Sequence, residues 1–420
     1  MTLKRVCKDE VQAVARRGLP EETLQQAAVI VEDVRREGEV ALRRWSEELG
    51  DLDSGSEAPL IWTPKSLGAE ADALDAVSRA VLERGAERVR CFAQAQREAL
   101  SPVEVSIPGG AAGHEVLPVE AAGCYAPGGR FPLPSTVLMT AVTARVAGVA
   151  QVWVASPRPT LETLAAAFLA GVDGLLAVGG AQAVAAMALG VGGLPRCDVV
   201  VGPGNRWVTA AKQLLFGQVG VDMLAGPTEL LVLADKDANA QLVAADLLGQ
   251  AEHDVDAMPI LVSTSEALVV AVEQALAAQL EDLSTREIAR VALDNGFAVV
   301  VRDTAEAVAV ADQLAPEHLQ ISMVNAAEVA TECRHAGALF IGEGSAEVLG
   351  DYCAGPNHTL PTVQGARHRG GLSVFDFLRV RTWLRIDDSL QAAELYKDAA
   401  QLAQMEGLAG HERAAKLRGG

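Results

Sequence analysis

The sequence predicts an α/β protein built on parallel sheets, and three observations support this class. From Ala121 onward, short apolar runs alternate with amphipathic stretches, the texture of repeated β-α units. Glycine-rich polar junctions follow several of the runs, as at strand ends of a doubly wound sheet. The 420 residues are 50% hydrophobic and 21% charged, which is a globular composition long enough for two or three domains.

The chain before Ala121 is predicted to be mainly helical. From Pro20 to Glu48, and again from Leu67 to Leu100, the spacing places charged residues on one face of a helix and apolar residues on the other. Val103 to Ile107 alternates like a strand and ends at a Pro-Gly-Gly turn.

Two series of strands and helices are expected after Ala121. Each apolar run is short, and the segments between runs have helical spacing, so each sheet should be parallel and covered on both faces. The expected strands are 123–125, 152–155, 175–178 and 198–201, then 230–233, 260–263, 298–302 and 338–341. Helices are expected near 135–147, 160–170, 181–190 and 206–215, and throughout the tail after about Asp387.

Charge and cysteine content exclude several classes of partner. A net charge of −20 repels phosphate backbones and anionic lipid, so neither nucleic acid nor a membrane surface is expected as a partner. The uncharged stretch from Gly174 to Pro195 is rich in glycine and alanine, which favours a buried strand, turn and helix over a membrane span. Six scattered cysteines without a CxxC, and an N-terminus without an apolar signal region, predict a reducing, cytoplasmic location.

The common nucleotide-binding fingerprints are absent, but other glycine junctions are present. The sequence has no GxGxxG, no GxxxxGK and no HExxH. Four junctions could let a phosphate or ribose approach the backbone, although ordinary tight turns would look similar one at a time. They are YAPGG from Tyr125, VGGAQ from Val178, VGPGN from Val201 and AGPTE from Ala225.

Four polar clusters are candidates for chemistry. Gln250 and His253 share one helix face and could meet one ion, although a histidine matched to the helix dipole explains the spacing equally simply. The Glu317-His318 pair could activate water and take up protons. The compact loop from Asp351 to His358 is unusually polar for its apolar neighbourhood. In the tail, the spacing of Glu406 and His411 places them on different stripes of a helix.

Taken in order, these motifs resemble the histidinol dehydrogenase family. The resemblance runs from about Pro118 to His411, and it is the ordered set that is specific. The segments that carry it are YAPGGRFPLPSTVLM, VGGAQAVAA, VGPGNRWVTAAK, DMLAGPTELLVLAD, DLLGQAEHD, APEHL, GDYCAGPNHTLPT and EGLAGH.

The resemblance implies a zinc- and NAD-dependent enzyme of the last two steps of histidine biosynthesis, acting on L-histidinol. It implies zinc ligands Gln250, His253, Asp351 and, from the other subunit, His411. Glu317 would activate water and His318 would act as general acid and base. Tyr125, Gln182 and Asn205 would hold NAD, and the substrate would meet Thr228, Gln250, His253, His318, Asp351, Glu406 and His411.

Two departures and two alternatives accompany this interpretation. Thr228 stands where many family members have serine, and Pro356 replaces the more usual threonine. A sister alcohol dehydrogenase with another small amino- or sulfo-alcohol substrate is one alternative. The other is a metal-dependent hydrolase or an inactive zinc-binding protein, which would leave the glycine junctions without a use.

The expected architecture has two Rossmann-like domains, one inserted in the other. An N-terminal segment, 1–19, would precede a first domain of 20–124 and 229–372 that holds the zinc and catalytic residues. The inserted domain, 125–228, would bind NAD. The helical tail, 373–420, would cross to a second subunit in a homodimer with shared active sites.

Overall fold

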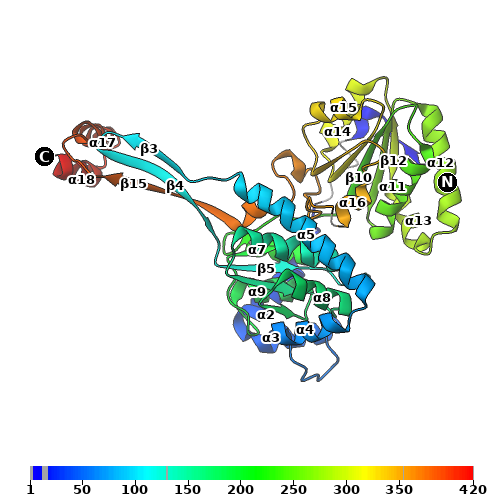
Figure 1. The fold of residues 1–420 in the computed structure, drawn as a ribbon, viewed down its shortest axis with the longest axis horizontal. Helices are drawn as coiled ribbons and strands as arrows, with labels where there is room; N and C mark the ends of the chain where they lie inside the picture. The colour runs from blue at the N-terminus through cyan, green and yellow to red at the C-terminus, as the bar shows by residue number, and fades with distance from the viewer. Residues whose placement is uncertain (1–2, 12–17, 129–130, 353, 420) are drawn as a thin grey trace.

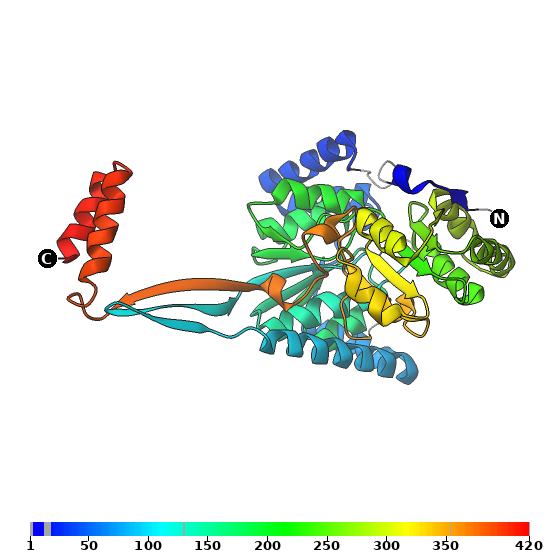
Figure 2. The same cartoon turned by 90° about the horizontal axis from the view of Figure 1, so that it is seen from above.

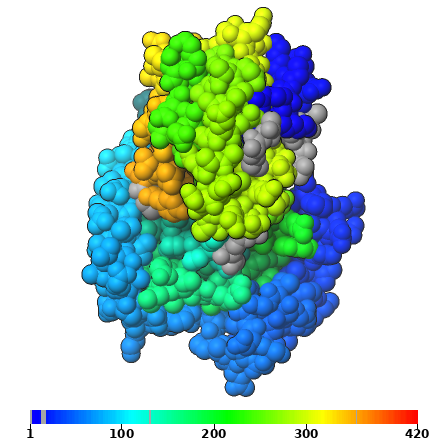
Figure 3. All heavy atoms as spheres, turned by 90° about the vertical axis from the view of Figure 1, so that its right-hand side faces the viewer, coloured from blue at the N-terminus to red at the C-terminus, as the bar shows by residue number. Residues whose placement is uncertain are grey.

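The computed structural model describes residues 3–11, 18–128, 131–352 and 354–419, which form two α/β lobes and a long arm (Figure 1). Lobe I and lobe II lie against each other, and the arm carries the C-terminal helices away from both (Figure 2). Seen from the side of lobe II, the two lobes are stacked in direct contact (Figure 3). The α/β class predicted from the sequence is confirmed.

Lobe I is built on a six-stranded sheet in the order β2-β7-β6-β5-β8-β9. The strand β5 is buried along its whole length at the centre, as expected where helices cover both faces. The strands are β2 (Ile61–Trp62), β5 (Ala121–Tyr125), β6 (Gln151–Ala155), β7 (Gly174–Leu176), β8 (Val199–Val201) and β9 (Gly220–Val221). The helices are α2 (Glu21–Glu37), α3 (Glu39–Glu48), α4 (Pro64–Ala73), α5 (Ala76–Glu98), α6 (Pro134–Val137), the π-helical η2 (Leu138–Val142), α7 (Thr143–Ala147), α8 (Leu161–Ala170), α9 (Gly180–Leu189) and α10 (Arg206–Leu215).

Lobe II has a second six-stranded sheet, in the order β1-β12-β11-β10-β13-β14, and all its pairings are parallel. Its strands are β1 (Lys4–Arg5), β10 (Glu229–Ala234), β11 (Met258–Ser263), β12 (Phe297–Val300), β13 (His318–Ser322) and β14 (Ala338–Ile341). Its helices are η1 (Lys8–Glu10), α11 (Ala240–His253), α12 (Glu266–Glu281), α13 (Arg286–Asn295), α14 (Thr304–Leu314), α15 (Ala326–Glu332) and α16 (Glu347–Asp351).

The arm is a three-stranded antiparallel sheet that ends in two helices. The order is β15-β4-β3, with Leu378 opposite Pro118 and Ile386 opposite Gly110. Its elements are β3 (Val103–Ile107), β4 (Gly110–Pro118), β15 (Leu378–Ile386), α17 (Ala393–Met405) and α18 (Ala409–Gly419). The short helices η3 (Gly365–Arg367) and η4 (Val374–Phe377) lie on the path from lobe II to the arm.

The predicted domain boundaries do not match these sheets. Residues 121–124 pair with β6 and β8, so they belong with 125–228 in lobe I, as do the helices α2 to α5, whereas β3 and β4 belong to the arm. Side chains of α2 and α3 join the same core as Tyr125 and Leu176. The physical reason is that β5 is the central strand of lobe I, and a boundary at residue 125 would separate that strand from both its neighbours.

Further differences concern the ends of the chain and one strand. The N-terminal segment adds β1 to the edge of lobe II. The predicted helical tail, 373–420, contains the strand β15 before the helices α17 and α18. The interior strand β13 was missed because its sequence, HLQIS, lacks the continuous apolar run by which the other buried parallel strands were recognised, although every residue is buried. The stretch from Gly174 to Pro195 contains β7 and α9, and none of the described helices is long and apolar enough to cross a membrane.

Candidate active site

The Glu317-His318 pair lies at the start of β13, where the backbone enters the lobe II sheet. Both side chains are buried. The Nδ1 atom of His318 lies 3.0 Å from the carbonyl oxygen of Glu229. Because a carbonyl can only accept, Nδ1 carries the proton, and in the neutral ring Nε2 keeps a free lone pair. That Nε2 atom is buried without a hydrogen-bond partner among the described residues.

Thr228 connects Glu317 to Gln250 through its hydroxyl group. The hydroxyl donates to Glu317 Oε2 over 2.6 Å, and the same carboxylate oxygen accepts the Glu229 N–H over 2.9 Å. Gln250 Nε2 donates to the Thr228 oxygen over 2.9 Å. This chain fixes the amide of Gln250, so that its Oε1 faces away, buried and without a partner among the described residues.

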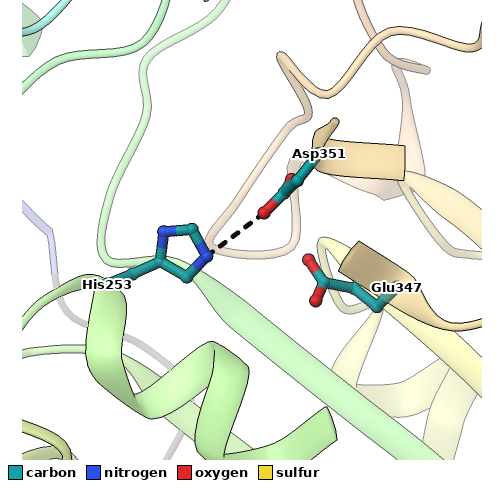
Figure 4. A group of neighbouring side chains, drawn as sticks. All are labelled: His253, Glu347 and Asp351. Carbon is teal, nitrogen blue, oxygen red and sulfur yellow. Dashed lines mark ion pairs between the residues drawn. The ribbon is translucent and has the colours of Figure 1, made fainter. Parts of the chain in front are cut away.

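The helices α11 and α16 bring His253, Glu347 and Asp351 together (Figure 4). His253 Nε2 lies 3.1 Å from Asp351 Oδ2, and ligand atoms of all three residues fall within 4.8 Å of one another. Glu347 and Asp351 are four apart on α16 and therefore project from one face. Glu347 also lies 3.5 Å from His318 Nε2, which joins this cluster to the Glu317-His318 pair.

Glu347 was missed in the sequence analysis. The available signal was its i, i+4 spacing from Asp351 on a helical turn, but a five-residue helix carries almost no periodicity. Glu229, whose backbone holds both Glu317 and His318, was also missed because a strand-initial glutamate in an apolar run has no motif of its own.

Buried and half-buried carboxylates outnumber cations in this cluster. Glu229, Glu317, Glu347 and Asp351 form no ion pair with any lysine or arginine of the described residues. Burial raises the pKa of Glu317, and burial together with Asp351 raises the pKa of Glu347. Burial also raises the pKa of Glu229, to about 8, with the charge of Glu317 contributing. A cation of any kind would relieve this repulsion.

The histidines respond to the same charges in different ways. Burial acts to lower the pKa of His253, but the hydrogen bond and charge of Asp351 outweigh it and raise that pKa. Burial acts to raise the pKa of Asp351, but His253, His358 and His318 lower it. Because the pKa of Glu347 is raised and that of Asp351 is lowered, Glu347 carries a proton more readily than Asp351 does.

The loop after Asp351 is tied to lobe I. His358 Nδ1 lies 3.0 Å from the Asp351 carbonyl oxygen, and its Nε2 lies 3.0 Å from the Thr136 hydroxyl. Asn357 donates to the carbonyl oxygen of Met139 in the π-helical turn η2. The same carbonyl oxygen also accepts the Thr143 hydroxyl over 2.6 Å, so the loop after Asp351 is anchored at the π-helical turn of lobe I.

Tyr125, Gln182 and Asn205 lie at or just beyond the carboxyl ends of lobe I strands. The strand order reverses between β5 and β8, which is where ligands bind in open parallel sheets. Asn205 caps α10 by accepting from Trp207 and Val208. Gly202 has φ +111° and a side chain there would lie 2.0 Å from the Tyr125 carbonyl oxygen, so only glycine fits.

The structure does not bring Glu406 and His411 to the other candidates within one chain. Glu406 ends α17 and His411 lies in α18, and both are exposed. These helices sit at the far end of the arm, away from both lobes (Figure 1).

Comparisons with known proteins agree along the whole chain. The family model described as histidinol dehydrogenase matches residues 16–419. Histidinol dehydrogenase from Thermus thermophilus is 46% identical over 416 residues, which are 98% of this chain and 98% of that protein. The enzyme of the same name from Acinetobacter baylyi is 42% identical over 403 residues, 94% and 93% of the two chains. A crystal structure of histidinol dehydrogenase from Elizabethkingia anophelis superposes with a TM-score of 0.91 at 29% identity, covering 99% of this chain and 98% of that one.

Proposed function

The chain belongs to the histidinol dehydrogenase family, and from this premise we propose that it oxidises L-histidinol through L-histidinal to L-histidine, with zinc and two NAD. The observation that carries the proposal is the cluster of buried carboxylates without a paired cation, next to a glutamine oxygen without a partner. The alternatives of a sister alcohol dehydrogenase and a hydrolase are not favoured, because relatives 42–46% identical over nearly the whole chain carry the name histidinol dehydrogenase.

The donor set suits zinc. Gln250 Oε1, His253 and Asp351, with His411 of a second copy, supply oxygen and nitrogen atoms, the ligands of a borderline cation. Bound zinc would supply the positive charge that anchors the imidazole and amine nitrogens of histidinol. The Thr228 hydroxyl accepts from the amide nitrogen of Gln250, which leaves the amide oxygen available as a ligand.

The lobe I loops suit a dinucleotide. Glycines at 180 and 202 have positive φ and leave open the space that side chains would fill around Tyr125 and Gln182. Bound NAD would supply the hydride acceptor for both oxidations.

The chain's own residues then account for the proton transfers. His318 has a free lone pair on Nε2, so it can take the proton from the substrate hydroxyl during alcohol oxidation. Glu317 uses Oε2 to accept from Thr228 and Glu229, which leaves Oε1 to take a proton from water when the aldehyde is hydrated. Its raised pKa makes it a stronger base than an exposed glutamate.

The proposal includes a homodimer with shared sites. On their own chain Glu406 and His411 lie far out on the arm, so they complete a site only in a second copy (Figure 2). Exposed apolar side chains on α17 and on the turn that follows it, Leu402, Met405 and Leu408, support burial of this tail against another subunit. A cytoplasmic location is also proposed, because the described cysteines, which exclude Cys353, are all free.

The test is NADH formation from histidinol, and separately from histidinal, before and after removal of metal with a chelator. Activity with both substrates that is lost on chelation and restored by zinc supports the proposal. Oxidation of other amino alcohols in preference to histidinol would contradict the substrate, and full activity after metal removal would contradict the role of zinc.

A further inference from the structure

Asp51 lies on the bend after α3 and reaches the start of α9. Its Oδ2 accepts the Gly179 N–H over 2.8 Å and the Gln182 Nε2–H over 3.2 Å. A carboxylate oxygen that accepts one N–H can only accept the other. The nitrogen of the Gln182 amide therefore faces Asp51, and its oxygen faces the opposite way.

The oxygen of Gln182 is enclosed by the protein and has no partner among the described residues. Gln182 is buried, and its Oε1 has no hydrogen bond among the described residues. Gly180 has φ +65°, and a side chain there would lie 2.7 Å from this oxygen. Glycine at this position therefore keeps a side chain from crowding Oε1, and an unsatisfied buried acceptor favours binding of a donor.

Tyr125 adds a complementary group at the same helix start. Its hydroxyl oxygen accepts the Gly180 N–H over 3.1 Å, and no described residue accepts its proton. Burial raises the pKa of Tyr125 to about 12, so the hydroxyl keeps that proton at neutral pH. The start of α9 thus offers one acceptor, Gln182 Oε1, and one donor, the Tyr125 O–H.

We propose that Asp51 is a positioning residue that locks the Gln182 amide with its oxygen toward the coenzyme, so that the coenzyme group bound there must donate a hydrogen bond. The inference rests on the proposed use of NAD. Two parts of NAD present an N–H donor beside an acceptor: the nicotinamide carboxamide and the amino edge of adenine.

The experiment measures coenzyme dissociation constants by calorimetry on the metal-loaded, full-length protein. Three ligands are compared: NAD, nicotinamide hypoxanthine dinucleotide, which replaces the adenine amino group by oxygen, and 3-acetylpyridine adenine dinucleotide, which replaces the carboxamide nitrogen by a methyl group. In the wild type, the analogue that lacks the relevant donor should bind about tenfold more weakly than NAD. Which analogue is penalised identifies the group.

Asp51→Ala should shrink that tenfold preference to about twofold, because the Gln182 amide becomes free to turn. Asp51→Asn should restore the preference, since an amide oxygen can replace Oδ2 as acceptor. Asp53→Ala, on the same loop and exposed, is the matched control and should change nothing. If Asp51→Ala does not fold, Gln182→Leu, with Asp51 intact, should abolish the preference.

The outcomes separate the inference from the proposed function. An unchanged preference in Asp51→Ala, with NAD merely weakened, would mean that Asp51 is only structural and would overturn the inference. A wild-type protein that binds none of the three dinucleotides would refute the coenzyme assignment itself.

Discussion

The two lobes have the same strand order at the centre of their sheets, but their candidate site residues lie at opposite ends of the strands. The central orders are β7-β6-β5-β8 and β12-β11-β10-β13. In lobe I the candidate residues follow the carboxyl ends, as at Tyr125. In lobe II, Glu229 and His318 begin their strands, so they lie at the amino ends. Strand order alone therefore does not decide which edge of a sheet carries chemistry.

The lobes also treat buried charge differently. In lobe I, Lys212 and Asp222 form a buried ion pair 2.6 Å apart, and Asp222 accepts the N–H groups of Gly202 and Met223. In lobe II the buried carboxylates face histidines and no arginine or lysine of the described residues. The paired charge in lobe I holds a loop in place, whereas the carboxylates of lobe II lack a paired lysine or arginine where we propose that a cation binds.

The largest expected effect is the loss of activity on replacing Glu317, the proposed proton acceptor in lobe II. Glu317→Gln keeps the shape and the hydrogen bonds to Oε2 but removes a proton acceptor, so histidinal oxidation should fall by about 10²–10⁴-fold. Histidinol oxidation to the aldehyde needs no water and should fall less. Separate assays with the two substrates measure this, with exposed Glu332→Gln as the control. Equal losses in both steps would contradict the water-activating role.

The ion pair of lobe I should show its effect in stability. Asp222→Asn leaves the Lys212 ammonium buried without a counter-ion, which should lower the free energy of unfolding by about 3–5 kcal/mol. Chemical denaturation measures this change. Asp237→Asn, which breaks an exposed pair with Lys236, should have almost no effect. If both variants had a similar free energy of unfolding, the buried Lys212–Asp222 pair would stabilise the fold no more than the exposed Lys236–Asp237 pair does.

Metal affinity is the next test of the difference between lobes. His253→Asn should weaken zinc binding by at least about 10–100-fold, because even partners beyond the direct ligands have effects of that size. Metal content after dialysis, by plasma emission, is the measurement. His368→Asn, exposed and outside the cluster, should keep its metal. Full metal retention in His253→Asn would refute the ligand assignment.

The smallest expected signal is a partial recovery in mixed dimers. Glu317→Gln and His411→Asn should each be inactive alone, but in a mixed dimer one site combines an intact Glu317 with an intact His411. About half the dimers are mixed after random reassortment, and half of their sites are intact, so about a quarter of wild-type activity should return. Co-refolding followed by NADH assay measures it. A mixture as inactive as its parents would show that His411 is not donated across subunits.

Local pattern predicted most of the regular structure. The apolar runs at 152–155, 230–233 and 260–263 became β6, β10 and β11, because short runs of branched residues between turns have few alternatives. The same reasoning failed for β13, whose Gln320 is buried by neighbouring strands that the sequence does not display. The pairing of β4 with β15 was also hidden, since the two strands are more than 250 residues apart in the chain.

The sequence by itself determined the α/β class, the glycine junctions and the ordered motifs that indicate the family. It did so because periodicity, turn residues and motif order are properties of short segments. Only the tertiary structure decided that β5 centres lobe I, that Glu347 joins His253 and Asp351, and that Asp51 holds the Gln182 amide. Those relations depend on strand pairing and on contacts between segments that are distant in the chain. The interaction energy there is set by which residues meet and by the distance between their atoms, and a local sequence pattern shows neither.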